Sequence, residues 1–327
     1  MKNSAGYFAD LTEAVGNGWN RFWFTPADPL PLSFLRIAVG ALVVMHLLAL
    51  GADFGRWFPA DGLLPPDAVK KVVLVEELDE PYHHYSYFNH LTGSQARFAH
   101  YAAIGLAIAF LLGLFTRVTG VLTVIALLSY VHRLPLLAGH ADPLLVFLVA
   151  YLCIGPAAAY WSLDRWIATL RGANPTKNEA PSLAAALSIR FIQVHLAAFV
   201  AMLAAAKMYG DAWWDGEAIW FLIAQTHSRP VDLSALHNWH YLINFWTHLV
   251  AYFELAFPIL IWNRQARPLL IGLGAAIWLS LIPVTGLLVF SLTLVVASLA
   301  FVPASTFRSL LSRPAGSPVT GGMPAAA

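Results

Sequence analysis

The chain has 327 residues, of which 59% are hydrophobic and only 11% are charged, with a formal net charge of +1. Soluble proteins carry about 25% charged residues, so this composition excludes both a soluble globular protein and a disordered chain. The small net charge and the absence of a long basic run give no basis for nucleic-acid binding.

Long apolar runs predict membrane-spanning helices, because a bilayer core about 30 Å thick needs about 20 apolar residues in a helix. The first run lacks a short apolar region followed by a small-residue cleavage site, so it is interpreted as a retained span and not as a signal peptide. In chain order, the eight predicted spans are 31–50, 99–114, 117–134, 142–160, 184–206, 241–262, 267–282 and 285–303.

These spans predict an all-α fold, a polytopic transmembrane helix bundle with one domain at 17–303. A cytoplasmic segment, 1–16, precedes it, and the Pro-, Gly- and Ala-rich tail 304–327 is expected to be disordered. Basic residues are enriched in cytoplasmic loops, and their distribution here places both termini inside the cell. The expected location is the inner (plasma) membrane, with the lipid bilayer as the first partner.

The same orientation places the long loops 51–98 and 207–240 on the outer face, together with most of the 12 histidines. One interpretation is a functional site on that face; the alternative is that loops are simply where His is solvated. The histidines concerned are His83, His84, His90, His100, His132, His140, His227, His237 and His240.

The fifth span is rich in Ala, which permits close helix packing and indicates a central position in the bundle. Gln193, Val200 and Lys207 share one face of this helix. Lys207 at its outer end either snorkels to the interface or is partly desolvated. A desolvated Lys loses its proton more readily and could act as a base.

The sixth span carries a polar stripe, because His240, Asn244 and His248 follow one another at intervals of four, with Glu254 close to the same face. Such a stripe should face protein or water and not lipid. A proton path, a ligand pocket and structural hydrogen bonds all remain open as its role. No metal site is predicted, since zinc-protease motifs are absent and Cys153 is the single cysteine.

Four strings occur in a specific order and spacing. The first is Arg-Phe-Trp-Phe-Thr-Pro-Ala-Asp-Pro from 21, continuing to Gly40, and the second is Gly-Leu-Phe-Thr-Arg at 113–117. The third runs from His-Arg-Leu-Pro at 132 through Gly-His-Ala-Asp to Tyr-Trp-Ser-Leu-Asp at 160–164. The fourth is Arg-Phe-Ile-Gln-Val-His from 190, leading to Lys-Met-Tyr-Gly-Asp-Ala-Trp-Trp-Asp-Gly at 207–216. Together they resemble the HTTM (horizontally transferred transmembrane) domain over roughly 17–303.

This domain is shared with vitamin K-dependent γ-glutamyl carboxylase, so the resemblance implies a quinol-linked carboxylase-like enzyme or oxidoreductase. In that enzyme a Lys amine deprotonates reduced vitamin K, which then reacts with oxygen and drives carboxylation of a peptide Glu. The resemblance implies that Lys207 is the Lys and that His140 is a second catalytic residue. It also implies a reduced quinone as cofactor and a peptide as substrate.

A related branch, of the sporulation-delaying protein B type, implies a different function. It would make this chain a non-enzymatic membrane partner in maturation or export of a small secreted peptide. A transporter is a further alternative, although the sequence shows no two matched halves. The predicted site is a pocket roofed by the outer loops, with Lys207 and His140 as catalytic residues and His240, Asn244, His248, Trp213, Trp214 and Gln193 as substrate-binding residues.

Overall fold

The computed structural model describes residues 4–73, 85–173, 179–225 and 230–311, and the regular elements in this part of the chain are all helices, as predicted. A bridge between Ala27 and Ser182 is the one β-type pairing within these ranges. Five helices are long and apolar enough to cross a membrane, which supports a membrane protein.

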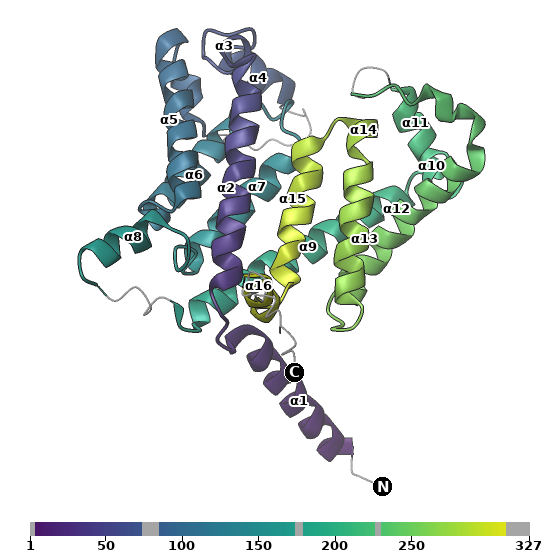
Figure 1. Ribbon diagram of the computed structural model, residues 1–327. Coiled ribbons are helices and arrows are strands. Elements are labelled where there is room, and N and C mark those ends of the chain that lie inside the picture. The colour runs from purple at the N-terminus through teal and green to yellow at the C-terminus, as the bar shows by residue number, and fades with distance from the viewer. Residues whose placement is uncertain (1–3, 74–84, 174–178, 226–229, 312–327) are drawn as a thin grey trace, which may run out of the picture.

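Figure 1 shows the long helices side by side in one bundle, with shorter helices at its two ends. The bundle comprises α2 (Leu30–Gly51), α5 (Gly93–Leu112), α6 (Thr116–Arg133), α7 (Ala141–Ile154), α9 (Leu183–Met208), α12 (His240–Leu260), α13 (Arg267–Ser280) and α15 (Leu288–Ser298). The other elements are α1 (Ser4–Phe24), α3 (Phe54–Trp57), α4 (Pro66–Val73), η1 (Tyr87–His90), α8 (Leu163–Leu170), α10 (Asp211–Trp214), α11 (Ala218–Ala224), η3 (Ser234–Asn238), α14 (Ile282–Thr285), η4 (Leu299–Phe301) and α16 (Ala304–Leu311).

Each of the eight predicted spans lies on one of the bundle helices, although several boundaries differ. The span predicted at 142–160 ends early, because α7 stops at Ile154. Pro156 follows Gly155 and disfavours helical backbone there, and Gly155 adopts an extended conformation. Helix α5 begins six residues before the span predicted at 99–114 and is a full-length helix of 20 residues.

Helix α2 lies at the centre of one half of the bundle and packs against α5, α7 and α15. Leu32, Leu35, Val39 and Val43 recur at helical spacing and are completely buried. Gly40 permits the closest approach: a Cβ there would lie 2.8 Å from the Cα of Leu111 in α5. A small residue at the crossing therefore lets the two backbones touch, as is typical of membrane helices.

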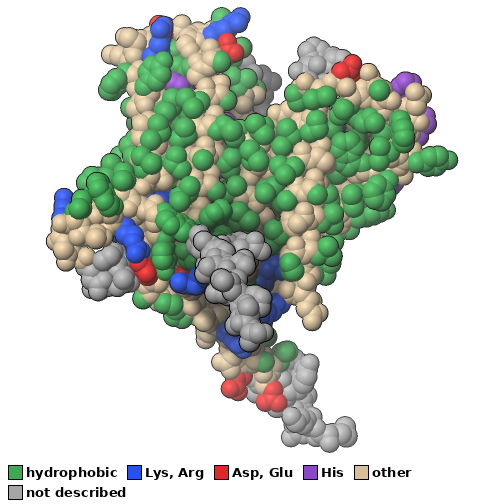
Figure 2. Space-filling model, viewed as in Figure 1, with side chains coloured by type: hydrophobic (Ala, Val, Ile, Leu, Met, Phe, Trp, Pro, Cys, Tyr) green, Lys and Arg blue, Asp and Glu red, His purple; other side chains and the backbone are tan. Residues whose placement is uncertain are grey.

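The surface of the bundle is itself apolar. Figure 2 shows hydrophobic side chains covering the middle of the visible face, with most charged side chains toward the two ends. Large aromatic side chains such as Phe98, Phe245 and Tyr252 are 76%, 63% and 55% exposed. Soluble monomers rarely expose apolar patches of this extent, so the surface fits a lipid environment.

The two ends are named here by their place in Figure 1: the upper end carries α3, α4, α11 and α14, and the lower end carries α1, α8 and α16. Helix α1 projects from the lower end and includes most of the segment expected at 1–16. The tail was expected to be disordered from residue 304, but 304–311 form α16. Phe307 of α16 packs on Phe34 with ring centroids 5.2 Å apart, and that contact anchors the helix.

Candidate functional site

The candidate site lies where α9 packs on α12, and the direction of the two helices determines which residues meet there. Lys207, near the end of α9, contacts Glu254 of α12, whereas Arg190, near the start of α9, lies close to Arg267 just beyond α12. These two pairings mean that α9 and α12 run antiparallel. They pack extensively against each other.

Helix α12 extends well past the end of α9. Glu254 lies about 14 residues, or about 21 Å, along the axis from the first residue of α12. Helices α10 and α11 pack on the part of α12 that projects beyond Met208. Lys207 therefore lies inside the bundle and not at its upper end, although it is the penultimate residue of α9.

Lys207 and Glu254 form a buried ion pair. The Nζ of Lys207 donates to the Oε2 of Glu254 at 2.6 Å, and the two side chains are 16% and 2% exposed. The ammonium also lies 5.0 Å from the centre of the Trp213 ring, which is within cation–π range. A single charge inside a bilayer costs about 2.5–3.5 kcal/mol on insertion scales, so mutual pairing explains why both charges are tolerated here.

The carboxylate of Glu254 has one oxygen in this pair and one left over. Its Oε1 makes no hydrogen bond to any of the residues that the structure describes. The site thus combines a held amine, an oxygen free to accept a proton, and an indole ring. In the sequence, Glu254 is only a neighbour of the polar stripe, and it was not among the predicted site residues.

The polar stripe of α12 binds the backbone that follows Lys207. Asn244 donates from Nδ2 to the carbonyl of Asp215 at 3.2 Å, and Nε2 of His248 lies 3.2 Å from the carbonyl of Trp214. Gly216 permits this approach: its φ is +80°, and a Cβ there would lie 1.9 Å from Nδ2 of Asn244. A proton path, a ligand pocket and structural hydrogen bonds were the possible roles of the stripe, and the contacts of the described residues are structural hydrogen bonds.

The other predicted site residues lie elsewhere. His140 is exposed before α7, with its ring 5.6 Å from that of Phe290, and it has no interaction with Lys207 among the described contacts. Gln193 donates to the carbonyl of Ala300 at 2.8 Å, about 21 Å from Lys207 along α9. His240 is exposed at the start of α12, and His83, His84 and His227 lie outside the described residues.

A second polar pair was not found in the sequence. Nε2 of His46 lies 2.8 Å from Oδ1 of Asp142, whose Oδ2 accepts from the backbone N–H of Gly139. Both side chains are largely buried between α2 and α7. The sequence did contain an indication of this pair, because His46 is a polar residue within the apolar run 31–50. The pair holds α2 against the turn that carries His140.

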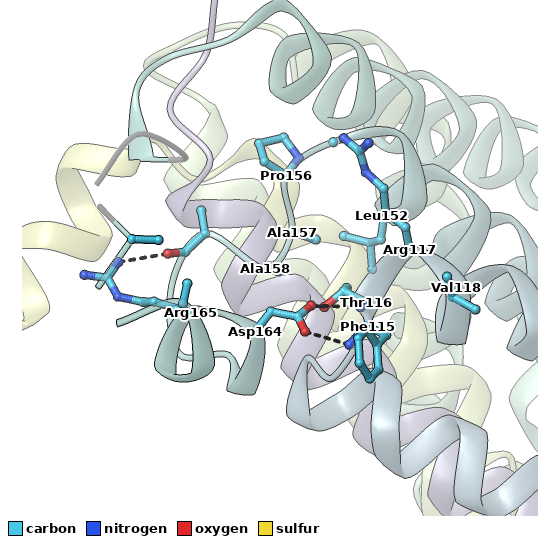
Figure 3. Close-up of a pocket in the computed structure, with 14 residues that line it drawn as sticks. Phe115, Thr116, Arg117, Val118, Leu152, Pro156, Ala157, Ala158, Asp164 and Arg165 are labelled. Carbon is cyan, nitrogen blue, oxygen red and sulfur yellow. Dashed lines mark hydrogen bonds between the residues drawn. The ribbon is translucent and has the colours of Figure 1, made fainter. Parts of the chain in front are cut away.

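A cavity of about 640 Å³ lies near the lower end, between the start of α6, the end of α7 and α8 (Figure 3). Two of its three charged side chains, Asp164 and Arg165, already have protein partners. The carboxylate of Asp164 accepts from the backbone N–H groups of Phe115 and Thr116, and Arg165 binds Glu179 and the carbonyl of Ala159. We therefore place the candidate site at Lys207 and not in this cavity.

Three of the four strings that carry the HTTM resemblance have residues at or beside that cavity. Asp164 of the 160–164 string binds the backbone of the 113–117 string through both its side chain and its N–H. Arg36 of the first string is buried and donates to the carbonyl of Trp161 at 2.6 Å. These three strings therefore define how helices pack at the lower end, and Lys207 lies apart from them.

No family model, no curated protein and no solved structure matches the chain.

Proposed function

We propose that this chain is an HTTM-type protein of the inner membrane, with eight spans and both termini in the cytoplasm, and that it acts on a reduced quinone at Lys207 and Glu254. The observation that carries the proposal is the buried ion pair. A Lys and a Glu from separate helices meet inside an apolar bundle, with one carboxylate oxygen free. Structural stability alone rarely requires such a pair, because well-packed apolar residues are often at least as stabilising.

The residues present suit a hydroquinone, which has a flat aromatic ring and hydroxyl donors. Trp213 offers a ring beside the amine, and Oε1 of Glu254 offers an acceptor. When bound, a reduced quinone would supply an acidic hydroxyl and the electrons for reaction with oxygen. The surrounding apolar helices would keep water away from the charged pair.

The ion pair can exchange its proton internally. Moving a proton across the 2.6 Å contact from Nζ of Lys207 to Oε2 of Glu254 leaves a neutral amine and a carboxylic acid, with no change in total charge. The neutral amine of Lys207 is then a base, and Glu254 stores the proton that it gave up. Proton transfer needs this kind of contact, with heavy atoms about 3 Å apart.

The Lys207→Arg substitution tests the catalytic role. Arg keeps the charge and the pairing with Glu254, but it does not lose its proton at ordinary pH. Quinol oxidation by the purified protein in lipid nanodiscs, under oxygen and carbon dioxide, should fall by about 100-fold or more. Quinone and epoxide products are measured by chromatography, and Lys207→Ala should behave in the same way.

Lys71→Arg is the matched control, because Lys71 is exposed and lies outside the bundle helices. It should leave turnover unchanged. Full activity of Lys207→Arg would refute the role of Lys207 as a base. Absence of turnover by the unaltered protein with any quinol would refute the quinone proposal itself.

A second candidate function is the non-enzymatic partner in maturation or export of a small secreted peptide. It is supported by the aromatic surface at the start of α12, where Trp239 and Tyr241 are 64% and 94% exposed. In this case Lys207 serves only to pair with Glu254. Lys207→Arg would then preserve peptide maturation in the native host, the opposite of the result expected for a base.

The proposed orientation is tested by cysteine labelling in a Cys153→Ser background. Gln265 lies in the turn between α12 and α13, and Asp232 lies between α11 and η3. With an impermeant reagent on intact cells, a cysteine at 232 should be labelled and one at 265 should be protected, because the proposed topology places 232 outside and 265 in the cytoplasm. The reverse labelling pattern would invert the topology.

A further inference from the structure

A small polar cavity at the lower end of the bundle contains two arginines that pair with no carboxylate among the residues that the structure describes. The cavity has a volume of about 210 Å³ and lies between the ends of α9, α13 and η4. Arg190 and Arg267 both line it, and their charges interact unfavourably. Like charges brought together in a partly buried cavity favour an anion between them.

The hydrogen bonds of Arg267 leave its charge poorly satisfied. It donates to the carbonyls of Ile261, Phe301 and Trp262 at 3.3, 3.4 and 3.5 Å, each longer than a normal N–H···O bond. These partners are neutral. A guanidinium in this position has its planar donors available for a stronger acceptor.

Arg190 is held in place and still has donors to spare. Its Nε donates to the carbonyl of Phe22 and its Nη1 to Oε1 of Gln193 at 2.8 Å, while Gln193 is itself fixed by Ala300. The Nη2 group makes no hydrogen bond to a described residue. This arrangement gives Gln193 a role in orienting Arg190.

The one acidic side chain among the residues lining the cavity does not neutralise these arginines. Asp28 accepts from Arg308 at 2.6 Å through Oδ2 and from the backbone N–H of Leu30 through Oδ1. Its charge is therefore used by a third arginine on α16. The cavity keeps an excess of positive charge.

We propose that this cavity binds a phosphate group, carried either by an anionic lipid headgroup or by free phosphate. The guanidinium fork matches phosphate oxygens, and such contacts are charge-assisted. The position fits a headgroup, because Figure 2 shows Lys and Arg side chains gathered at the lower end, just below the apolar surface. This site is separate from Lys207 and does not depend on the proposed function.

The test measures the thermal stability of the purified full-length protein with three probes: phosphatidylglycerol, phosphatidylcholine and inorganic phosphate, at constant ionic strength. Stabilisation by phosphatidylglycerol alone identifies a lipid phosphate, whereas stabilisation by inorganic phosphate identifies the free anion. Equal effects of the two lipids together with no effect of inorganic phosphate would overturn the proposal.

Substitutions of the arginines test whether the stabilising probe binds in this cavity. Arg267→Gln should weaken the apparent affinity for the stabilising probe by about ten- to 100-fold, because one charged donor is lost. Arg171→Gln, at an exposed arginine that does not line the cavity, should bind as the unaltered protein does. Unchanged affinity in Arg267→Gln would refute the site. If Arg267→Gln does not fold, Arg190→Gln provides the same comparison, because it also removes one of the two guanidinium groups that line the cavity.

Discussion

Replacing Glu254 with Gln lowers the free energy of unfolding by about 3–5 kcal/mol, because the ammonium of Lys207 is left in the bundle without a counter-charge. Gln has the shape of Glu, so the loss reports the charge and not a cavity. Lys207→Met should lower the free energy of unfolding by a similar amount, since it leaves the carboxylate of Glu254 without a counter-charge. Reversible unfolding in detergent or in bilayer discs measures both values.

The double variant Lys207→Met with Glu254→Gln separates pairing from packing. With no charge left to strand, it should recover most of the stability lost by either single variant. The control is Arg308→Gln, which breaks the pair with Asp28 in which the Arg308 side chain is 55% exposed. An exposed pair of this kind contributes at most about 1 kcal/mol. Additive losses in the double variant would contradict a direct coupling of Lys207 and Glu254.

Gly113→Ala is the second substitution with a large expected effect. Gly113 has a φ of +71°, and a Cβ there would lie 1.7 Å from Nη1 of Arg36 and 2.6 Å from Cβ of Ser162. The buried Arg36 would have to move and give up its bond to Trp161. We expect a loss of about 3 kcal/mol or more in the free energy of unfolding, from backbone strain and from displacement of a buried charge.

Gly172 provides the matched control. Its φ is +72°, almost the same, but a Cβ there would meet nothing within 4 Å. Gly172→Ala should therefore lower the free energy of unfolding by only about 1–2 kcal/mol, the cost of a left-handed backbone conformation at a residue with a Cβ. Equal losses in the two variants would mean that Arg36 adapts freely, and the tight packing at the lower end would not be a source of stability.

Much of the fold follows from local sequence. Hydrophobic length alone located all eight bundle helices, and a Gly-Pro pair at 155–156 explains why one of them ends early. The helix α16 was missed because its short sequence borders a Pro- and Gly-rich tail. Its order comes from a tertiary contact, the packing of Phe307 on Phe34, which no local pattern contains.

The site was harder to predict, for a geometric reason. Helical periodicity indicates which residues share a face of α9 or of α12, but not how far one helix slides past the other. Gln193 and Lys207 do share a face, yet they are about 21 Å apart along it. The shift of α12 beyond the end of α9 is what brings Glu254, and not His240, to Lys207.

The placement of the two charges on α9 and α12 also bears on how the protein is made. Helix α9 is synthesised before α12, and Glu254 is available to Lys207 only after the ribosome has added 47 more residues. In the proposed membrane topology, α9 would therefore enter the bilayer before its counter-charge exists. A chain released before α12 would hold an uncompensated ammonium next to lipid, at about 2.5–3.5 kcal/mol on insertion scales. Such a fragment would keep this cost, whereas the complete chain removes it by closing the pair.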